Sequence, residues 1–179
     1  FYSGIPGTVG GAVKMNAGCF GSETKEILID IKTINKKGEI KTINQKNLNL
    51  DYRQSHLPEG DIIISANFHC NYGDKNEIAK KIKEIKINRE KTQPLKEKTS
   101  GSTFKNPKNN FAAKLIEMSN CKGLSEGGIF VSNKHANFLI NKQQGNANQI
   151  EELGNKIIEK VYDKFKIKLE WEIKIIGKK

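Results

Sequence analysis

Three isoleucines recur at every second position within residues 27–34, a pattern that is typical of a strand with one buried face. They are Ile27, Ile29 and Ile31. A short polar turn separates this segment from a second apolar segment at 40–43, and the two together predict a hairpin. Residues 62–69 predict a further strand, which we expect to be buried on both faces at its start.

Apolar residues at helical spacing mark three other segments. Residues 77–90 carry isoleucines at i, i+4 and i+7, and a shorter helix is expected to begin near Phe111. The third helix is predicted around Asn148 and Glu151, which stand at capping-box spacing. Its apolar positions are Ile150, Leu153, Ile157, Val161 and Phe165. Residues 167–175 alternate again and predict a half-buried strand.

Two more strands are expected at 129–131 and 136–140. Strands mixed with three helices, without regular βαβ alternation, indicate an α+β fold. The helical pattern breaks at Pro94, and the residues that follow are polar. We therefore predict two domains, residues 1–93 and residues 94–179.

The charge of the chain is basic, with 31 Lys and Arg against 20 Asp and Glu and a formal net charge of +11. Such a balance is also found in nucleic-acid-binding domains, because cations neutralise phosphates. Lysine, asparagine and isoleucine are abundant, however, and all three have A/T-rich codons. The lysines form no dense tract, so a solvated surface is favoured and a nucleic-acid-binding domain is the minor alternative. Only Arg53 and Arg89 are arginines, and lysine cannot replace their planar fork.

Membrane spans, secretion and metal binding find little support in the sequence. The longest apolar runs, such as 62–64, are far shorter than the ~20 residues of a transmembrane helix, and the first residues lack the basic region of a signal peptide. The three cysteines are far apart and without CxxC spacing, and the three histidines add no zinc pattern. They are Cys19, Cys70 and Cys121. We expect reduced cytosolic thiols and no metal.

Glycines are frequent near the start of the chain, in two neighbouring segments. The two are Ser3-Gly4-Ile5-Pro6-Gly7-Thr8-Val9-Gly10-Gly11-Ala12 and Met15-Asn16-Ala17-Gly18. Successive backbone N–H groups of such a loop can converge on an anion, and Thr8 and Asn16 could add side-chain hydrogen bonds. The run is neither a G-x-G-x-x-G turn after a strand nor a Walker loop. On these residues alone, an anion-binding loop and a plain glycine-rich turn are equally open.

Three later strings add to this one. They are Asp51-Tyr52-Arg53-Gln54-Ser55, Ser100-Gly101-Ser102-Thr103-Phe104-Lys105-Asn106-Pro107, and Gly127-Gly128-Ile129-Phe130-Val131-Ser132-Asn133-Lys134-His135-Ala136-Asn137-Phe138. In this order, and over residues 1–177, the chain resembles the UDP-N-acetylenolpyruvoylglucosamine reductase family. The glycine-rich run is shared with a wider family of FAD-linked oxidases and reductases and implies a flavin fold. The Gly-Ser-x-Phe-Lys-Asn-Pro string is the specific one.

The resemblance implies an enzyme of bacterial peptidoglycan precursor synthesis in the cytoplasm. Members of the family reduce UDP-N-acetylglucosamine enolpyruvate to UDP-N-acetylmuramate, with NADPH reducing FAD and the flavin delivering hydride to the substrate. The expected cofactors are therefore FAD and NADPH. The expected partner is the UDP-sugar substrate, with neither nucleic acid nor a membrane.

In the family, an earlier FAD-binding subdomain precedes the region that this chain resembles. We therefore expect residues 1–93 to be the remaining part of an FAD-binding domain, and residues 94–179 to be a substrate-binding domain with a C-terminal return strand. FAD binding by this chain alone is expected to be weak, and a separately encoded N-terminal half is an expected partner. The alternative is a non-catalytic remnant or an interaction protein.

The resemblance also implies three catalytic residues. Ser102 is the expected proton donor, because a hydroxyl can quench the charge that hydride addition leaves beside the substrate carboxylate. Arg53 is expected to grip a carboxylate and stabilise enolate charge through two parallel hydrogen bonds. Glu172 is expected to stabilise the intermediate. Alternation alone leaves Glu170 and Glu172 equally open, and the family's C-terminal ending favours Glu172.

The remaining expected contacts also follow from the resemblance. Cofactor-binding residues are expected in the glycine-rich run, namely Gly4, Ile5, Pro6, Gly7, Thr8, Gly10, Gly11, Ala12 and Asn16. Substrate contacts are expected from Tyr52, Lys105 and Asn106, although Asn106 also suits the cap of a helix. His135 is left without a role, since a turn histidine between two strands is the favoured interpretation.

Overall fold

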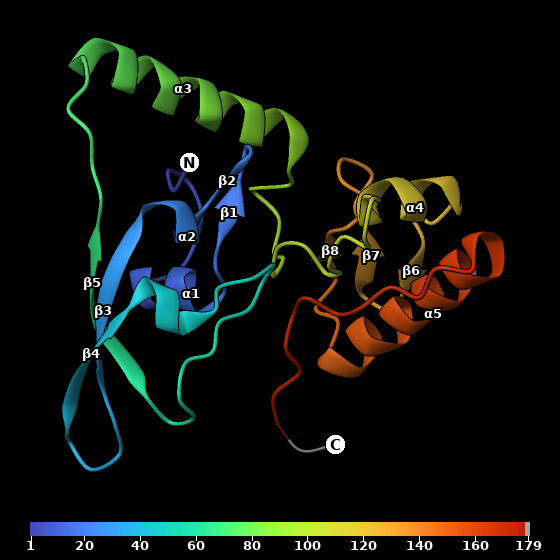
Figure 1. The fold of residues 1–179 in the computed structure, drawn as a ribbon. Coiled ribbons are helices and arrows are strands. Elements are labelled where there is room, and N and C mark those ends of the chain that lie inside the picture. Colours follow the sequence, from blue (N-terminus) through green and yellow to red (C-terminus); the bar gives the residue numbers. More distant parts are fainter. Residues whose placement is uncertain (178–179) are drawn as a thin grey trace. The chain divides into compact units, whose positions relative to one another are not determined.

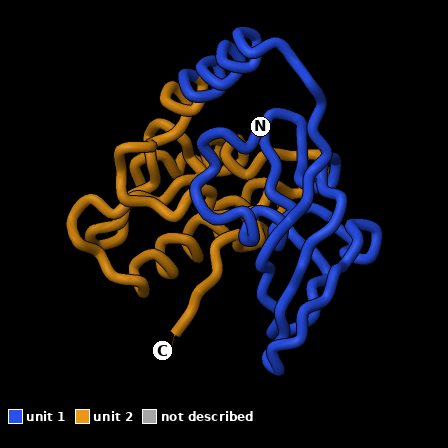
Figure 2. Tube along the Cα trace, turned by 90° about the vertical axis from the view of Figure 1, so that its left-hand side faces the viewer, with its two compact units in different colours: residues 1–87 blue, residues 88–179 orange. Residues whose placement is uncertain are grey.

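The computed structural model describes residues 1–177, and the chain divides into two compact units at residues 87 and 88 (Figure 2). The sequence placed the division between residues 93 and 94, six residues later. Helix α3, Lys75–Thr92, runs across the observed division. Among the described residues, no helix combines the length and the apolar character that crossing a bilayer requires.

The first unit contains a three-stranded antiparallel sheet in the order β4-β3-β5, together with a small β1-β2 hairpin (Figure 1). Its elements are α1 (Val9–Lys14), β1 (Gly18–Cys19), β2 (Ser22–Glu23), α2 (Thr24–Ile27), β3 (Leu28–Ile34), β4 (Ile40–Asn44), the 3-10 helix η1 (Gln45–Leu48), β5 (Ile62–Phe68) and α3. The β3-β4 hairpin confirms the prediction from the sequence. A small core fills the space beside the sheet, formed by Val13, Leu28, Ile31 and Leu48.

The predicted buried face of β3 is wrong in its register. The pairing of β3 with β5 shifts between Leu28 and Asp30, which is the signature of a β-bulge. Because the bulge interrupts the alternation, Leu28 and Ile31 are buried while Ile29 is 44% exposed. The start of β5 is also not buried on both faces, since Ile62 is 65% exposed.

The glycine-rich segment is not a loop throughout, because it contains α1. The hydroxyl of Thr8 accepts a hydrogen bond from the N–H of Gly11 at 3.0 Å and caps the helix. Gly10 lies against β5, where an added Cβ would stand 3.5 Å from Cβ of Ile63. Two glycines in this short helix therefore serve packing and capping, and neither has a left-handed backbone.

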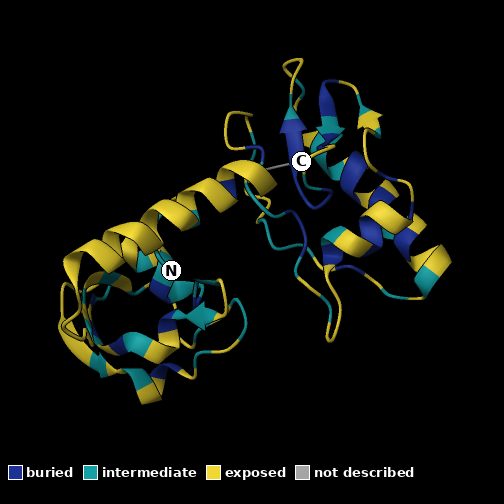
Figure 3. Ribbon diagram, turned by 90° about the horizontal axis from the view of Figure 1, so that it is seen from above, coloured by how far each residue is buried: buried dark blue, intermediate teal, exposed yellow. Residues whose placement is uncertain are grey.

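Helix α3 confirms the helix predicted at 77–90, with two further residues at each end. Its apolar stripe is largely exposed, with Ile78 at 48% and Ile82 at 38%. Arg89 is the buried residue of this helix. The long helix drawn mostly in yellow in Figure 3 shows the same exposure. The spacing of the isoleucines therefore predicted the helix, but it did not predict which side chains of the helix are buried.

The second unit packs two helices with a three-stranded antiparallel sheet in the order β6-β7-β8. Its elements are α4 (Ala112–Met118), β6 (Ser125–Glu126), β7 (Ile129–Val131), β8 (Leu139–Asn141) and α5 (Ala147–Phe165). Strand β7 confirms the strand predicted at 129–131, whereas β8 overlaps only the last two residues of the strand predicted at 136–140. The core between the helices and the sheet includes Phe104, Leu115, Ile116, Ile129, Leu153, Ile157, Val161 and Leu169. Mixed helices and strands without βαβ order confirm the α+β class.

The start of α5 lies two residues before the predicted cap. Asn146 is the N-cap, and its side chain accepts from the N–H of Gln149 at 3.0 Å while Gln149 returns a bond to the N–H of Asn146. This reciprocal pair is a capping box. The predicted pair Asn148 and Glu151 has the same spacing but lies inside the helix.

The strand predicted at 167–175 is wrong, because this segment is extended without a regular ladder. It makes one isolated bridge, between Trp171 and Phe104. The alternation survives in burial, with Leu169 at 2% exposure and Glu170 exposed. The partner segment around Phe104 is itself short, and this limits the pairing to a few residues.

Candidate active site

A tight turn in the first unit carries Tyr52 and Arg53. Asp51 and Gln54 exchange two backbone hydrogen bonds of 3.1 Å, which leaves Tyr52 and Arg53 as the two residues of the turn. Arg53 has φ of +56°, in the left-handed region. The carboxylate of Asp51 accepts from the N–H of Tyr52 at 2.7 Å, so the turn is closed by its own side chain.

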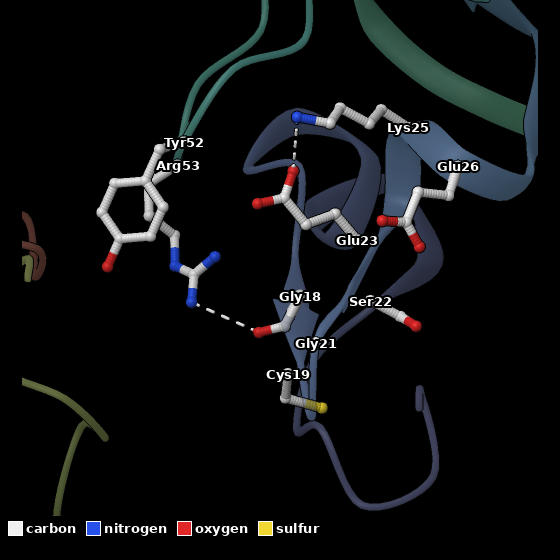
Figure 4. Close-up of a pocket in the computed structure, with 9 residues that line it drawn as sticks. All are labelled: Gly18, Cys19, Gly21, Ser22, Glu23, Lys25, Glu26, Tyr52 and Arg53. Carbon is white, nitrogen blue, oxygen red and sulfur yellow. Dashed lines mark hydrogen bonds and ion pairs between the residues drawn. The ribbon is translucent and has the colours of Figure 1, made fainter. Parts of the chain in front are cut away.

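The Arg53 guanidinium lies beside a cavity of about 320 Å³ (Figure 4). It donates to the carbonyl oxygen of Gly18 at 3.3 Å, and its central carbon lies 4.8 Å from the centroid of the Tyr52 ring. The cavity is lined by Gly18, Cys19, Gly21, Ser22, Glu23, Lys25, Glu26, Tyr52 and Arg53. Two predicted site residues therefore share one cavity with the β1-β2 hairpin.

Glu23 and Lys25 add a charged pair to this cavity. Their side chains meet at 2.9 Å, and the contact with Lys25 is the main reason that the pKa of the Glu23 carboxyl lies below its usual value. Hydrogen bonding by Asn16 and the charge of Arg53 act in the same direction. The cavity thus combines two cations, Lys25 and Arg53, with the carboxylates of Glu23 and Glu26.

The residues predicted for FAD lie at and before the start of α1. Gly4, Pro6, Gly7, Thr8 and Gly11 are exposed, and Ile5, Gly10 and Ala12 are half-buried. Gly7 has φ of +125° and open space where a Cβ would stand. The first N–H groups of a helix have no intrahelical acceptor. An exposed glycine turn that leads into such N–H groups is compatible with the diphosphate of FAD.

The Ser102 segment lies in the second unit, between two other extended segments. On one side Ser102 bridges to Phe138, and the N–H of Thr103 donates to the carbonyl of Asn137 at 2.8 Å. On the other side the N–H of Glu172 donates to the carbonyl of Thr103 at 2.9 Å. Ser102 is half-buried, and within residues 1–177 its hydroxyl has no hydrogen-bond partner.

The structure brings the Ser102 and Glu172 main chains together and distinguishes the two C-terminal glutamates. Glu170 has a side chain that is 74% exposed and pairs with the ammonium of Lys105 at 3.3 Å. Glu172 is half-buried and follows the bridge at Trp171. Of the two, Glu172 is the more buried, and its role in the site stays a prediction.

Asn106 has the structural role that was its alternative interpretation. Its side-chain oxygen accepts from the N–H of Ala112 at 3.0 Å, at the first residue of α4. His135 likewise lies in the turn between β7 and β8, where its ring meets the edge of Phe138 with centroids 4.6 Å apart. Its Nδ1 accepts from the N–H of Asn137, and burial lowers its pKa.

Two residues of this arrangement were missed in the sequence. Glu23 lines the cavity, and Asn137 holds the backbone of the Ser102 segment. The sequence offers little signal for either, because Glu23 bonds to Asn16, 7 residues away, and Asn137 bonds to Phe104, 33 residues away. Over residues 1–177, no group of three or more His, Cys, Asp or Glu side chains could hold a metal ion.

A family model for the C-terminal domain of UDP-N-acetylenolpyruvoylglucosamine reductase matches residues 93–176. The reductase of Sphingopyxis alaskensis is 44% identical over 178 residues, which cover 99% of this chain and 60% of that relative. The reductase of Rickettsia conorii is 43% identical, with the same coverage. The chain is similar to reductases of this family over nearly its whole length.

The fold of the family is preserved as well. The crystal structure of the reductase from Thermus caldophilus matches with a TM-score of 0.84 and 34% identity, covering 96% of this chain and 61% of that structure. The chain thus spans about 60% of the length of these relatives.

Proposed function

We propose that this chain provides the substrate-binding region, and part of the FAD-binding region, of a UDP-N-acetylenolpyruvoylglucosamine reductase. The reaction is the reduction of UDP-N-acetylglucosamine enolpyruvate to UDP-N-acetylmuramate with FAD and NADPH, in the bacterial cytoplasm during peptidoglycan precursor synthesis. The observation that supports this proposal is the hydrogen bond of 2.9 Å between the Glu172 and Thr103 main chains, because it joins the segment of Glu172 to the segment of Ser102.

FAD would be held by the exposed glycine turn and by the N–H groups at the start of α1. When bound, the flavin supplies the hydride that reduces the enolpyruvyl double bond. Side chains of this chain bind the substrate and supply the proton. Arg53 binds the substrate carboxylate, since its charge lies at the wall of a polar cavity and a guanidinium can donate two parallel hydrogen bonds. Tyr52 forms the next part of the same wall.

Ser102 gives its proton to the substrate carbon beside the carboxylate. A serine hydroxyl is a weak acid, so nearby charge must stabilise the alkoxide that the transfer leaves. Lys105 lies three residues later on the same extended segment, and its ammonium pairs with the exposed carboxylate of Glu170. Glu172 lies on the neighbouring segment. Ser102 and Lys105 thus supply the acid and a nearby cation from one segment, and Glu172 belongs to the segment bonded to it.

The test replaces Ser102 by alanine in the FAD-loaded protein, in which this chain is assembled with the expected N-terminal FAD-binding subdomain. Reduction of the flavin by NADPH should remain close to wild type, because that step needs no proton from Ser102. Reoxidation of the flavin by the enolpyruvyl substrate should slow by about 10²–10⁴-fold, the usual contribution of acid–base catalysis. Stopped-flow absorbance of the flavin separates the two steps.

Ser100→Ala is the matched control, because Ser100 is exposed on the same segment, two residues away. It should leave both half-reactions unchanged. Reoxidation of Ser102→Ala at the wild-type rate would remove Ser102 as the donor.

A further inference from the structure

Asn16 is fully buried at the end of α1, and its side chain joins three segments of the first unit. Its amide nitrogen donates to the carboxylate of Glu23 at 2.9 Å and to the carbonyl of Asp51 at 3.1 Å. Its amide oxygen accepts from the N–H of Lys25 at 2.9 Å. Glu23 and Lys25 line the cavity, and Asp51 lies in the turn that carries Arg53.

These bonds engage both N–H groups and the oxygen of the amide. Both donors of the amide are used, so donating to a cofactor would require one of the present bonds to break, and the buried oxygen is not exposed to a ligand. The backbone of Asn16 also has an unusual conformation. Its φ is +40°, a value that asparagine adopts more easily than most residues. The geometry therefore fits a residue that holds other residues in place.

The Arg53 turn is held by this network at its first residue. Asp51 presents its carbonyl to Asn16 and exchanges two backbone bonds with Gln54. A second tie follows immediately, where the hydroxyl of Ser55 donates to the carbonyl of Lys14 at 2.8 Å. The turn is thus fastened to the end of α1 on both sides of Arg53.

The opposite wall of the cavity is fixed by the same amide. The carboxylate of Glu23 accepts from Asn16 and pairs with Lys25, and Arg53 donates across to Gly18 on the neighbouring strand (Figure 4). One buried amide therefore sets the spacing between the β1-β2 hairpin and the Arg53 turn.

We propose that Asn16 is a positioning residue for substrate binding, which acts by fixing Arg53 against the cavity wall. This inference rests on the proposed function, since it assigns the substrate carboxylate to Arg53. It is an alternative to the expectation that Asn16 contacts FAD. An error of about 1 Å in the placement of a binding group can cost on the order of 10²-fold in rate, so a buried amide far from the reacting atoms can have a large effect.

The test compares Asn16→Gly with Arg53→Lys in the FAD-loaded protein. Glycine keeps the left-handed backbone free of strain and removes only the side-chain bonds. Asn16→Gly should lower kcat/KM for the enolpyruvyl substrate by about 10²-fold, mainly through KM, and should weaken binding of the UDP-sugar in calorimetry. FAD content and flavin reduction by NADPH should stay at wild-type levels.

Asn49→Gly is the matched control. Asn49 has the same φ of +40° in the same unit, but it is exposed and lies outside the cavity. This variant should behave like wild type in every measurement. If Asn16→Gly does not fold, Asn16→Asp should still raise KM, because it keeps the acceptor for Lys25 but places a second carboxylate beside Glu23.

The double variant distinguishes positioning from general support of the fold. If Asn16 acts through Arg53, adding Asn16→Gly to Arg53→Lys should cost little beyond Arg53→Lys alone. Fully additive losses would overturn the inference, and so would an unchanged KM or a loss of FAD from the Asn16 variants. An unchanged KM in Arg53→Lys would instead overturn the proposed role of Arg53 in substrate binding.

Discussion

Asn137 holds the main chain of Phe104 through both groups of its side-chain amide. Its nitrogen donates to the carbonyl of Phe104 at 2.8 Å, and its oxygen accepts from the N–H of Phe104 at 2.9 Å. Both residues are buried, at 4% and 1% exposure. The amide takes the place of a neighbouring strand at the point where the backbone pairing with Ser102 and Thr103 ends.

Asn137→Ala should therefore destabilise the protein strongly. It leaves a buried N–H and a buried C=O without partners, and each such group costs about 1–3 kcal/mol. Asn141→Ala is a matched control, because Asn141 makes the same pair of bonds with Gly145 but is only half-buried. Water can replace its bonds, so its loss in the free energy of unfolding should be smaller. Urea unfolding measures both, and equal losses would contradict the argument.

The sequence predicted those elements that local spacing determines. The β3-β4 hairpin and helix α3 follow from residues close together in the chain. The failures depend on tertiary partners. The bulge at Ile29 arises from pairing with β5, and residues 167–175 lack a ladder because their neighbour is short. The sequence misplaced the N-cap of α5 because two pairs, Asn146 with Gln149 and Asn148 with Glu151, have capping-box spacing. Of the two asparagines, only Asn146 lies outside the helix.

The same distinction holds for the candidate site. Motif resemblance drew attention to Arg53, Ser102 and Glu172, and the structure places the last two on adjacent segments. Resemblance could not show that Asn16 and Asn137 have side chains saturated by bonds across 7 to 35 residues of chain. A buried amide has no periodicity, so its role becomes visible only when its partners are assembled.

Gly154→Ala should disrupt the packing of Trp171. Gly154 lies within α5, and an added Cβ would overlap the indole ring, which also meets Phe104 with centroids 5.0 Å apart. Overpacking of this kind typically costs about 1–3 kcal/mol. Trp171 is the single tryptophan of the sequence, so its emission spectrum reports the displacement directly.

Gly10→Ala provides the comparison for Gly154, because its added methyl would meet Ile63 only at an ordinary 3.5 Å. It should leave the tryptophan emission unchanged. An unshifted emission maximum in Gly154→Ala would show that the indole is not displaced and would contradict this prediction.

Acidification should destabilise the second unit through His135. Burial lowers the pKa of His135, so the folded state holds the neutral ring, whose Nδ1 accepts from the N–H of Asn137. The unfolded state binds a proton near pH 6.5, before the folded state does. Stability is therefore complete above about pH 6.5 and falls as the pH drops from there towards the folded pKa.

His135→Gln removes this titration and should flatten the pH dependence of the free energy of unfolding between about pH 7 and pH 5. His69→Gln, at an exposed position of the first unit, should retain it. Urea unfolding at several pH values provides the comparison. The assignment fails if His135→Gln loses stability on acidification as steeply as the wild type.

Glu172→Gln and Glu170→Gln should separate the two C-terminal glutamates in the flavin-oxidation step. Glu172 is half-buried, and its main chain is bonded to the Ser102 segment, so its charge can act on the reacting region. Glu170 makes a surface pair with Lys105, and exposed pairs contribute only about 0–1 kcal/mol. Glu172→Gln should slow flavin oxidation by the enolpyruvyl substrate at least about tenfold, while flavin reduction by NADPH is unchanged. Glu170→Gln should stay within a few-fold of wild type in both steps, and the reverse order of effects would transfer the predicted role to Glu170.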